Sequence, residues 1–282
     1  MRKTKIGIVG YGYVGRAMAE FFNGHYDVII NDPALSKSRV STPDPATMAE
    51  INQCDVAVVC VPTPKTLEGP CDTSIVEAVV DQLRTPLILI KSTVSVGTCG
   101  RMAAKHASKI VFSPEYCGES SYWTPYDFHT EIKETPFFIF AGPPAATSAM
   151  VDLFLPVTGP VKRYIQTPNY RAAEMAKYLE NTYYATKVAF CYEAAEICRA
   201  VGVDWNEARE LWLADPRINP MHTAVFAGNA RPFGGKCLPK DLAGMIGASR
   251  DHGYEPCLLA EVEATNDRIE RHRSKENRRV TP

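Results

Sequence analysis

The sequence has no marked excess of charge of either sign and no long apolar run. Its 282 residues carry 31 Lys and Arg against 32 Asp and Glu, a net charge of −1 at pH 7. This balance gives no general reason to expect binding to nucleic acid or to an anionic membrane. No apolar stretch is long enough to span a bilayer. Residues 1–5 lead directly into a strand-like segment, where a secretory signal would need an apolar core.

The sequence also lacks Cys-x-x-Cys pairs, the spacing typical of zinc sites and redox motifs. Its nine cysteines are odd in number and scattered, so reduced thiols are favoured over a disulfide framework or a metal site. Without a secretory signal, this distribution predicts a cytoplasmic protein. The length and the 45% hydrophobic content are sufficient for two domains with ordinary cores.

Short apolar runs alternate with helix-like segments through the first half, the pattern typical of a parallel α/β sheet. The expected strands are Lys5–Gly10, Asp27–Asn31, Val56–Val61, Pro86–Lys91, Lys109–Ser113 and Pro136–Ala141. The expected helices between them are Gly15–Asn23, Ser74–Gln82 and Thr98–Ala107. The stretch Leu155–Thr167, rich in Pro and Gly, reads as a last strand followed by a domain boundary.

The second half opens with an unusually long helical pattern. Thr167 and Pro168 suit the N-cap and first position of a helix, and Gly202 suits its end. Nothing between them breaks a helix, which predicts about 33 residues spanning about 50 Å. Such a helix outruns one small domain, so we expect a homodimer through it. The charged ending Arg268–Arg279 reads as a solvated helix end rather than a nucleic-acid arm.

A glycine-rich turn follows the first expected strand. Gly10-Tyr11-Gly12-Tyr13-Val14-Gly15 stands between that strand and an apolar helical segment, the context in which GxGxxG binds a dinucleotide. The first glycine permits the tight turn, the second lets a pyrophosphate approach, and the third allows close helix packing. The phosphates would lie at the helix N-terminus, where free N–H groups favour anions.

Asp32 ends the second expected strand, 22 residues after Gly10. A carboxylate there accepts hydrogen bonds from the ribose diol and repels a 2′-phosphate, which favours NAD over NADP. The alternative is an ordinary turn aspartate before Pro33. These patterns predict a Rossmann-type NAD-binding domain at residues 1–166 and an all-α domain at residues 167–282, built on the long helix.

A second motif, Phe233-Gly234-Gly235-Lys236-Cys237-Leu238-Pro239-Lys240-Asp241, carries the candidate chemistry. Two glycines allow close approach of a ligand, and Pro239 suits the first turn of a helix. The Cys237 thiolate would be favoured beside a helix N-terminus and two lysines. Asp241 lies four residues later, on the same helical face. This predicts a nucleophile with an acid/base or water-positioning partner; the alternative is a merely buried cysteine.

Several segments, in order, resemble the UDP-glucose/GDP-mannose dehydrogenase family. Besides the cysteine loop, they are Val61–Pro64, Lys91–Thr98, Ser113–Glu115, Ala176–Thr182, Lys187–Phe190 and Asp215–Ile218. The resemblance runs from about residue 5 to about residue 270. It implies oxidation of the C6 alcohol of a nucleotide sugar to a carboxylate with two NAD, through a Cys237 thiohemiacetal and thioester.

The resemblance implies roles for individual residues. The expected catalytic residues are Cys237, Lys177, Asn181, Asp241, Thr93 and Glu119. The expected cofactor contacts are Gly10, Gly12, Tyr13, Val14, Gly15, Asp32, Val61, Pro62, Thr63, Thr93 and Glu115. The expected substrate contacts are Glu115, Lys177, Asn181, Arg217, Phe233 and Gly234.

By the same resemblance, Lys177 stabilises the developing oxyanion and Asn181 orients the sugar or water. Asp241 positions or activates water, assisted by Thr93 and Glu119. The family usually has an Arg directly before the residue that corresponds to Glu119, whereas this chain has Gly118. This difference weakens the assignment of Glu119. For two residues an interpretation without function remains open: Lys177 as a solvated side chain and Arg217 as an exposed loop residue. The resemblance implies instead that Arg217 reaches the substrate across a dimer interface.

Family members usually continue into a third domain that closes over the substrate nucleotide, whereas this sequence ends soon after Ala264–Asp267. We expect either a short form or a chain from which that domain has been cut. The leading interpretation is a UDP-glucose 6-dehydrogenase. The alternatives are a UDP-HexNAc or GDP-mannose 6-dehydrogenase, a 3-hydroxyacid dehydrogenase and a non-catalytic NAD- or nucleotide-sugar-binding protein.

Overall fold

The computed structural model describes residues 2–35, 45–66, 71–117, 131–226, 232–235 and 237–280, with side chains of the last range described to residue 272. The chain divides into two compact units. The first unit comprises Met1–Pro64 and Asp72–Lys177, and the second comprises Lys65–Cys71 and Tyr178–Pro282. In the described ranges, no helix is both long and apolar enough to cross a membrane.

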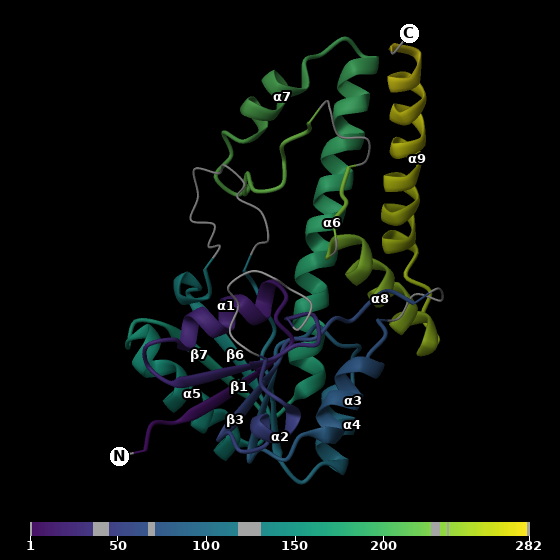
Figure 1. The fold of residues 1–282 in the computed structure, drawn as a ribbon. Helices are drawn as coiled ribbons and strands as arrows, with labels where there is room; N and C mark the ends of the chain where they lie inside the picture. The colour runs from purple at the N-terminus through teal and green to yellow at the C-terminus, as the bar shows by residue number, and fades with distance from the viewer. Residues whose placement is uncertain are drawn as a thin grey trace. The chain divides into compact units, whose positions relative to one another are not determined.

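The first unit is built on a seven-stranded sheet with the order β2-β1-β3-β4-β5-β6-β7 (Figure 1). The strands are β1 (Lys5–Val9), β2 (Asp27–Asn31), β3 (Val56–Val59), β4 (Leu87–Ile90), β5 (Lys109–Phe112), β6 (Phe137–Ala141) and β7 (Arg163–Thr167). The predicted α/β class is therefore confirmed, and each expected strand lies within two residues of its observed bounds.

Two strands depart from the expected parallel sheet, because β6 and β7 both run opposite to the other five. β6 pairs antiparallel with β5, through Phe112 and Ala141, whereas all other pairings are parallel. A parallel neighbour requires a crossover, usually a helix. In the described part of the β5–β6 connection, the only helical element is the short 3₁₀ turn η2 (Ile132–Glu134). The alternation of apolar runs could not reveal this direction.

Helices cover both faces of the sheet. They are α1 (Tyr13–Phe22), α2 (Met48–Ile51), α3 (Ser74–Gln82), α4 (Thr98–Lys105) and α5 (Pro144–Thr158). One core joins α1 and α5 to side chains such as Ile8 and Val58; another joins α2, α3 and α4 to Val59 and Ile90. Because both faces are buried, β3 reads as the unbroken apolar run Val-Ala-Val-Val.

Helix α5 corrects the extent of the last expected strand in Leu155–Thr167. Leu155–Thr158 forms the last turn of α5, with Pro156 inside the helix, and the strand begins only at Arg163. The helix is apolar on nearly all sides, so its sequence has no clear helical period. The prolines and glycines of this stretch were therefore a stronger sequence signal than its helical pattern, and its first residues were not predicted as helix.

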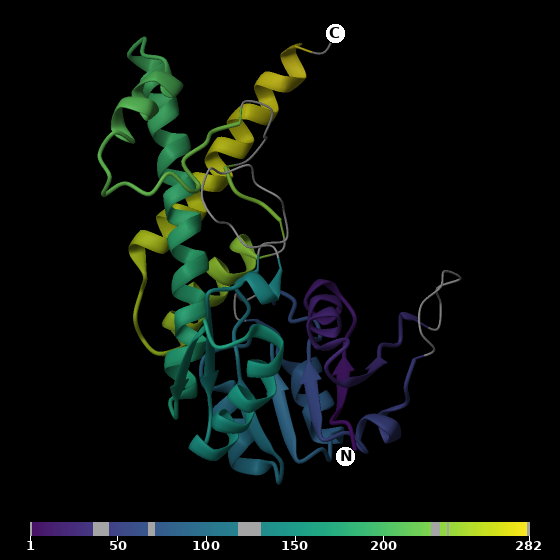
Figure 2. The same cartoon turned by 90° about the vertical axis from the view of Figure 1, so that its left-hand side faces the viewer.

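The second unit is helical. It contains most of α6 (Tyr170–Ala200), with α7 (Trp205–Trp212), α8 (Leu238–Asp251) and α9 (Cys257–Val280). The core of the unit is built mainly of side chains from α6, α8 and α9, including Tyr192, Leu242 and Val262. Figures 1 and 2 show the course of these three helices.

The long helix confirms the predicted element with one change at its start. The helix begins at Tyr170, and the Asn169 side chain accepts the Ala172 N–H at 3.1 Å, so Asn169 takes the N-cap role expected of Thr167. At the other end, Gly202 has φ +78°, a conformation that glycine adopts without strain. Gly202 is thus the helix stop that the sequence predicted.

Candidate active site

The glycine-rich turn leaves the N-terminus of α1 open. At Gly15 a Cβ atom would lie 1.9 Å from the Gly10 carbonyl oxygen, so the helix approaches the strand as only glycine permits. At Gly12 a Cβ would meet no atom within 4 Å. The first turn of α1 carries no acidic residue and no side-chain cap, so the positive end of the helix dipole favours an anion there. The residues present fit a dinucleotide pyrophosphate.

Asp32 follows β2 and fixes this turn from the side. One carboxylate oxygen accepts the Tyr11 N–H at 2.6 Å, and the other accepts the Ala34 N–H at 2.7 Å. The second bond is that of an ordinary turn aspartate, and the first places the carboxylate beside the glycine-rich turn. A carboxylate has about four lone-pair sites, so Asp32 retains acceptors for ribose hydroxyls. Its contact with ribose stays a prediction.

The ends of β3 and β4 bring two predicted segments together. Ser92 donates a hydrogen bond to the Val61 carbonyl at 2.8 Å, so the Val61-Pro62-Thr63 segment is held against the start of the loop that contains Thr93. Thr63 is 9% exposed and Thr93 is half-buried. Both segments lie at the carboxyl edge of parallel strands, where ligands of open α/β sheets bind.

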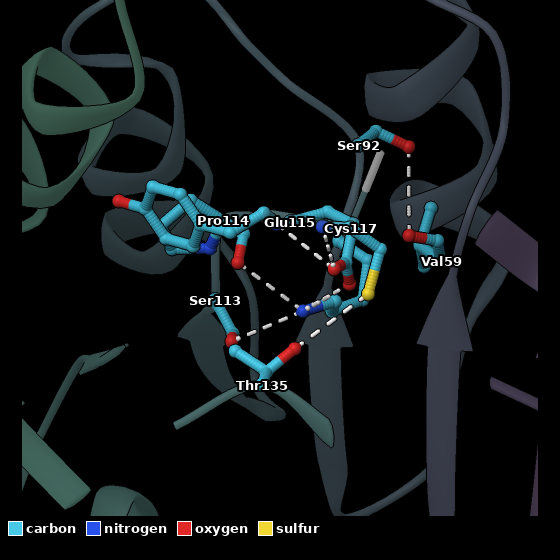
Figure 3. A network of polar contacts seen from close by, with 9 residues as sticks. Val59, Ser92, Ser113, Pro114, Glu115, Cys117 and Thr135 are labelled. Carbon is cyan, nitrogen blue, oxygen red and sulfur yellow. Dashed lines mark hydrogen bonds and ion pairs between the residues drawn. The ribbon is translucent and has the colours of Figure 1, made fainter. Parts of the chain in front are cut away.

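A buried ion pair lies beside these segments (Figure 3). Lys91, 2% exposed, places Nζ 2.9 Å from Glu115 Oε2 and donates to Ser113 Oγ and the Pro114 carbonyl at 3.3 Å. The other Glu115 oxygen accepts the N–H groups of Tyr116 and Cys117 at 2.8 and 2.9 Å. The predicted cofactor and substrate contact Glu115 is therefore held by its own loop and by Lys91.

Charge fixes the state of Glu115. Burial alone raises the pKa of this carboxyl, but the Lys91 ammonium, with hydrogen bonds from Lys91 and Cys117, outweighs it and lowers the pKa to about 2. The motif containing Lys91 was recognised in the sequence, but Lys91 itself received no role. A lysine directly after an otherwise buried strand is the signal that could have identified it.

Lys177 is the last residue of α6 that belongs to the first unit. Its Nζ lies 4.8 Å from the centre of the Tyr116 ring, a cation–π distance, and its side chain is half-buried. The structure thus brings Lys177 to the segment that contains Glu115, although 62 positions separate the two in the printed sequence. Glu119 lies outside the described residues.

In the second unit, Asn181 and Asp241 are in direct contact. Asn181, 6% exposed on α6, donates its side-chain N–H to Asp241 Oδ2, and Asp241 is 1% exposed. Lys240 Nζ lies 2.5 Å from the other carboxylate oxygen. Because a carboxylate only accepts hydrogen bonds, it fixes which end of the Asn181 amide faces it. Sequence reasoning named Lys240 only as one of two lysines near the Cys237 thiol and did not predict its ion pair with Asp241.

Cys237 is the N-cap residue of α8. It is half-buried, and its carbonyl accepts the Asp241 N–H at 2.9 Å, which confirms that the two residues stand one turn apart on a helix. The thiol therefore lies at a helix N-terminus, where a thiolate is favoured. Before it, Phe233 is 5% exposed and donates its N–H to Asn266 at 3.0 Å. Gly234 is half-buried, and Lys236 lies outside the described residues.

Arg217 takes a different position. Its side chain is 86% exposed and pairs with Asp215 at 2.6 Å. Nearby, His222 adopts φ +65° and stacks on Tyr184 with ring centres 4.4 Å apart. Burial, with the Lys187 charge, lowers the pKa of His222 to about 4, so this imidazole is neutral near pH 7. No sequence pattern marked His222.

Two sequence models of one protein family match the chain. Residues 34–132 match the NAD binding domain of the UDP-glucose/GDP-mannose dehydrogenase family, and residues 171–268 match its central domain. Together the two matches cover well over half of the chain.

Individual relatives agree with these matches. The chain is 29% identical to UDP-glucose 6-dehydrogenase AglM of Haloferax volcanii, over 93% of this chain and 69% of that protein. It is 30% identical to UDP-glucose 6-dehydrogenase of Pseudomonas aeruginosa, over 79% of this chain and 51% of that protein. It thus spans about half the length of the second relative. The fold is similar to UDP-glucose dehydrogenase from Pyrobaculum islandicum, with TM-score 0.80, 22% identity, and coverage of 94% and 68%.

Proposed function

The chain belongs to the UDP-glucose/GDP-mannose dehydrogenase family, and we propose that it oxidises the C6 alcohol of UDP-glucose to a carboxylate. The observation that carries this proposal is the first turn of α8, where Cys237 caps the helix and Asp241 holds Asn181 one turn later. A single oxidation of an alcohol needs no nucleophilic thiol, whereas oxidation to a carboxylate benefits from covalent capture of the aldehyde.

NAD is the cofactor, and when bound it accepts one hydride in each oxidation. In the first oxidation the alcohol must lose a proton as its hydride leaves. We assign Lys177 to the stabilisation of the developing negative charge on oxygen, because its half-buried ammonium lies 4.8 Å from the centre of the Tyr116 ring, next to the loop that contains Glu115.

Cys237 carries the second stage of the proposed reaction. Its thiolate adds to the aldehyde carbon, forming a C–S bond, and the carbonyl oxygen takes up a proton to give a thiohemiacetal. Loss of that proton and of a hydride from the same carbon gives a thioester. Water then attacks the thioester carbon and the C–S bond breaks, which returns the thiolate and releases the carboxylate and two protons.

Asp241 and Asn181 are assigned to the water and the oxygen of this reaction. Both Asp241 oxygens are engaged, one by Lys240 and one by Asn181, so the carboxylate is fixed in position. It orients the Asn181 amide, which orients the substrate oxygen or the attacking water. This division gives Asp241 a positioning role and leaves proton removal to water or to a second base.

We also propose a homodimer through α6. Four apolar side chains at spacings of four and seven residues lie on one face of the helix. These side chains are Leu179, Tyr183, Phe190 and Ile197, which are 52, 62, 57 and 59% exposed. A second copy of the chain would cover this stripe. Phe190→Glu with Ile197→Glu should yield a monomer by light scattering, whereas the isolated Val161→Glu, 85% exposed, should not change the mass.

We place this activity in the reducing cytoplasm, since all nine cysteines are free thiols.

The decisive experiment incubates the protein with NAD and a panel of UDP-glucose, UDP-N-acetylhexosamines and GDP-mannose, and follows NADH. Two NADH per sugar, with UDP-glucose turned over fastest, supports the proposal. If a UDP-N-acetylhexosamine or GDP-mannose is turned over faster than UDP-glucose, the proposed substrate is replaced by that nucleotide sugar. One NADH per substrate indicates a hydroxyacid-type enzyme, and binding without turnover a non-catalytic protein.

A further inference from the structure

A buried carboxylate on α6 has no part in the chemistry assigned above. Glu174 is 1% exposed, and each of its side-chain oxygens accepts one backbone N–H. Oε2 accepts from Gly97 at 2.5 Å and Oε1 from Cys99 at 2.8 Å. Both N–H groups belong to the N-terminus of α4, so a residue of one helix caps another helix.

The N-terminus of α4 depends on this outside cap. The N-cap residue is Gly97, which has no side chain to accept the first N–H groups, and the first turn of α4 contains no acid. Gly97 has φ +92°, the left-handed region that glycine tolerates. This conformation turns its N–H toward Glu174 instead of continuing the helix. The negative carboxylate also complements the positive end of the helix dipole.

The capped residue ends the loop that carries Thr93, Lys91–Gly97, here named the Thr93 loop. Its first residue is fixed by the ion pair with Glu115, and Ser92 is hydrogen-bonded to the Val61 carbonyl. Glu174 fixes its last residue. The Thr93 loop is therefore held at both ends, and only the second attachment joins it to α6.

Lys177 follows Glu174 by three residues on α6, and residues at this spacing share one face of a helix. A displacement of Glu174 along or around the helix axis therefore moves Lys177 by a similar amount. We propose that Glu174 is a positioning residue, which sets α6 against the Thr93 loop so that Lys177 and Thr93 act on the same substrate carbon. This inference rests on the proposed dehydrogenase function.

The carboxylate is specifically suited to this task. An amide in its place presents one oxygen and one NH₂ group, so one of the two backbone N–H groups would face another donor. Glu174→Gln is thus nearly isosteric but removes one of the two attachments. Glu174→Asp keeps both acceptors and the charge but shortens the reach by one methylene group.

Tyr170→Phe provides a matched control. The Tyr170 hydroxyl donates to the Ile110 carbonyl at 2.6 Å, one helical turn before Glu174, and so attaches the same end of α6 to β5 instead of to the Thr93 loop. Each variant loses one buried hydrogen bond, and we expect each melting temperature to fall by about 2–4 °C.

The two variants should differ in turnover. For Glu174→Gln, kcat with UDP-glucose should fall about 10²-fold, the effect of a misplacement near 1 Å, while the KM for NAD changes less than about 3-fold. Glu174→Asp should recover part of the loss. Tyr170→Phe should keep kcat within about 2-fold of the wild type.

A second measurement does not require activity. The lysines are ¹³C-methylated, and the Lys177 signal is assigned by its loss in Lys177→Arg. In the wild type this signal should carry a ring-current shift from Tyr116, which Glu174→Gln reduces and Tyr170→Phe retains. An unchanged shift and an unchanged kcat in Glu174→Gln, with the same thermal loss as Tyr170→Phe, would show that Glu174 only stabilises the fold. If no nucleotide sugar is turned over, the proposed function fails, and the ring-current shift still decides the positioning role.

Discussion

Glu174 is buried in the first unit and Glu115 is nearly so, with 11% of its side chain exposed. Both accept two backbone N–H groups, but their pKa values shift in opposite directions. Burial raises the pKa of each carboxyl. At Glu115 the Lys91 ammonium, 2.9 Å away, reverses the effect and gives a pKa of about 2. At Glu174 the N–H groups of Cys99 and Gly97 and the charge of Arg101 only reduce it, so the pKa stays raised.

The difference shows what one buried cation does. Two backbone N–H groups satisfy the hydrogen bonds of a carboxylate without restoring the solvation of its charge. A single ammonium in contact restores it. Glu115 is therefore ionised throughout the physiological pH range. The pKa of Glu174, which caps α4, lies closer to neutrality than that of Glu115.

Removal of the cation should have the largest effect. Lys91→Met leaves Glu115 buried without its partner, and we expect the free energy of unfolding at pH 7 to fall by about 3–5 kcal/mol. Urea denaturation measures this loss, and the Lys91→Met/Glu115→Gln double variant should recover part of it. Arg2→Met breaks the exposed pair with Asp55, 72% and 45% exposed, and should leave the denaturation midpoint unchanged. Equal losses in Lys91→Met and Arg2→Met would contradict this account.

Acid titration tests the charge of Glu115 directly. Its pKa in the folded chain, about 2, lies below the ordinary value of 4.5, so its contribution to stability is present above about pH 4.5 and is lost as the pH falls toward 2. The contribution amounts to about 3 kcal/mol. Glu115→Gln should therefore flatten the decline in unfolding free energy between pH 5 and pH 2 by about that amount. A decline as steep as in the wild type would argue against the ion pair.

The second unit offers a related pair at a smaller scale. Lys240 is 18% exposed and Asp241 only 2%, at 2.5 Å, so water partly solvates the cation when the pair is broken. We expect Lys240→Met to cost about 1–3 kcal/mol. It should also lower kcat about 10-fold, because Asp241 holds the Asn181 amide less firmly. Arg268→Met, which breaks an exposed pair with Glu193, serves as the control. Full activity in Lys240→Met would show that Lys240 has no role in the candidate active site.

The smallest expected effect has the opposite sign. Because the pKa of Glu174 is raised in the folded chain, its contribution to stability is present at low pH and is lost as the pH rises through that pKa. Glu174→Gln should remove this loss, so that the unfolding free energy of the variant depends less on pH above the ordinary glutamate value of 4.5. The same urea series measures it. A wild-type slope in Glu174→Gln would indicate that the Glu174 pKa is not raised.

Elements with local signals could be predicted from the sequence. β3 and β4 are continuous apolar runs, and α6 has a helix stop at Gly202 and no breaker before it. Cys237 and Asp241 stand four residues apart, so their shared helix turn follows from spacing. Strand direction and evenly apolar helices have no such signal, which explains the reversed strands β6 and β7 and the missed α5.

The buried contacts of the candidate site could not be predicted in the same way. Asn181 and Asp241 are 60 residues apart, and Glu174 and Gly97 are 77 apart. Family resemblance indicated Asn181 and Asp241 as single residues, but no local pattern paired them. Lys91 and Glu174 belong to this class too: each acts by satisfying a charge or an N–H group that only the folded chain brings near.

The second and third glycines of the nucleotide turn, Gly12 and Gly15, differ in a way that is useful for genetics. A methyl group at position 15 would collide with the Gly10 carbonyl at 1.9 Å, whereas the same group at Gly12 enters unfilled space. Gly12→Ala should therefore leave an intact scaffold whose dinucleotide cradle is obstructed. Cells that carry such a chain would separate the consequences of lost catalysis from those of a missing protein, a distinction that deletion of the gene cannot make.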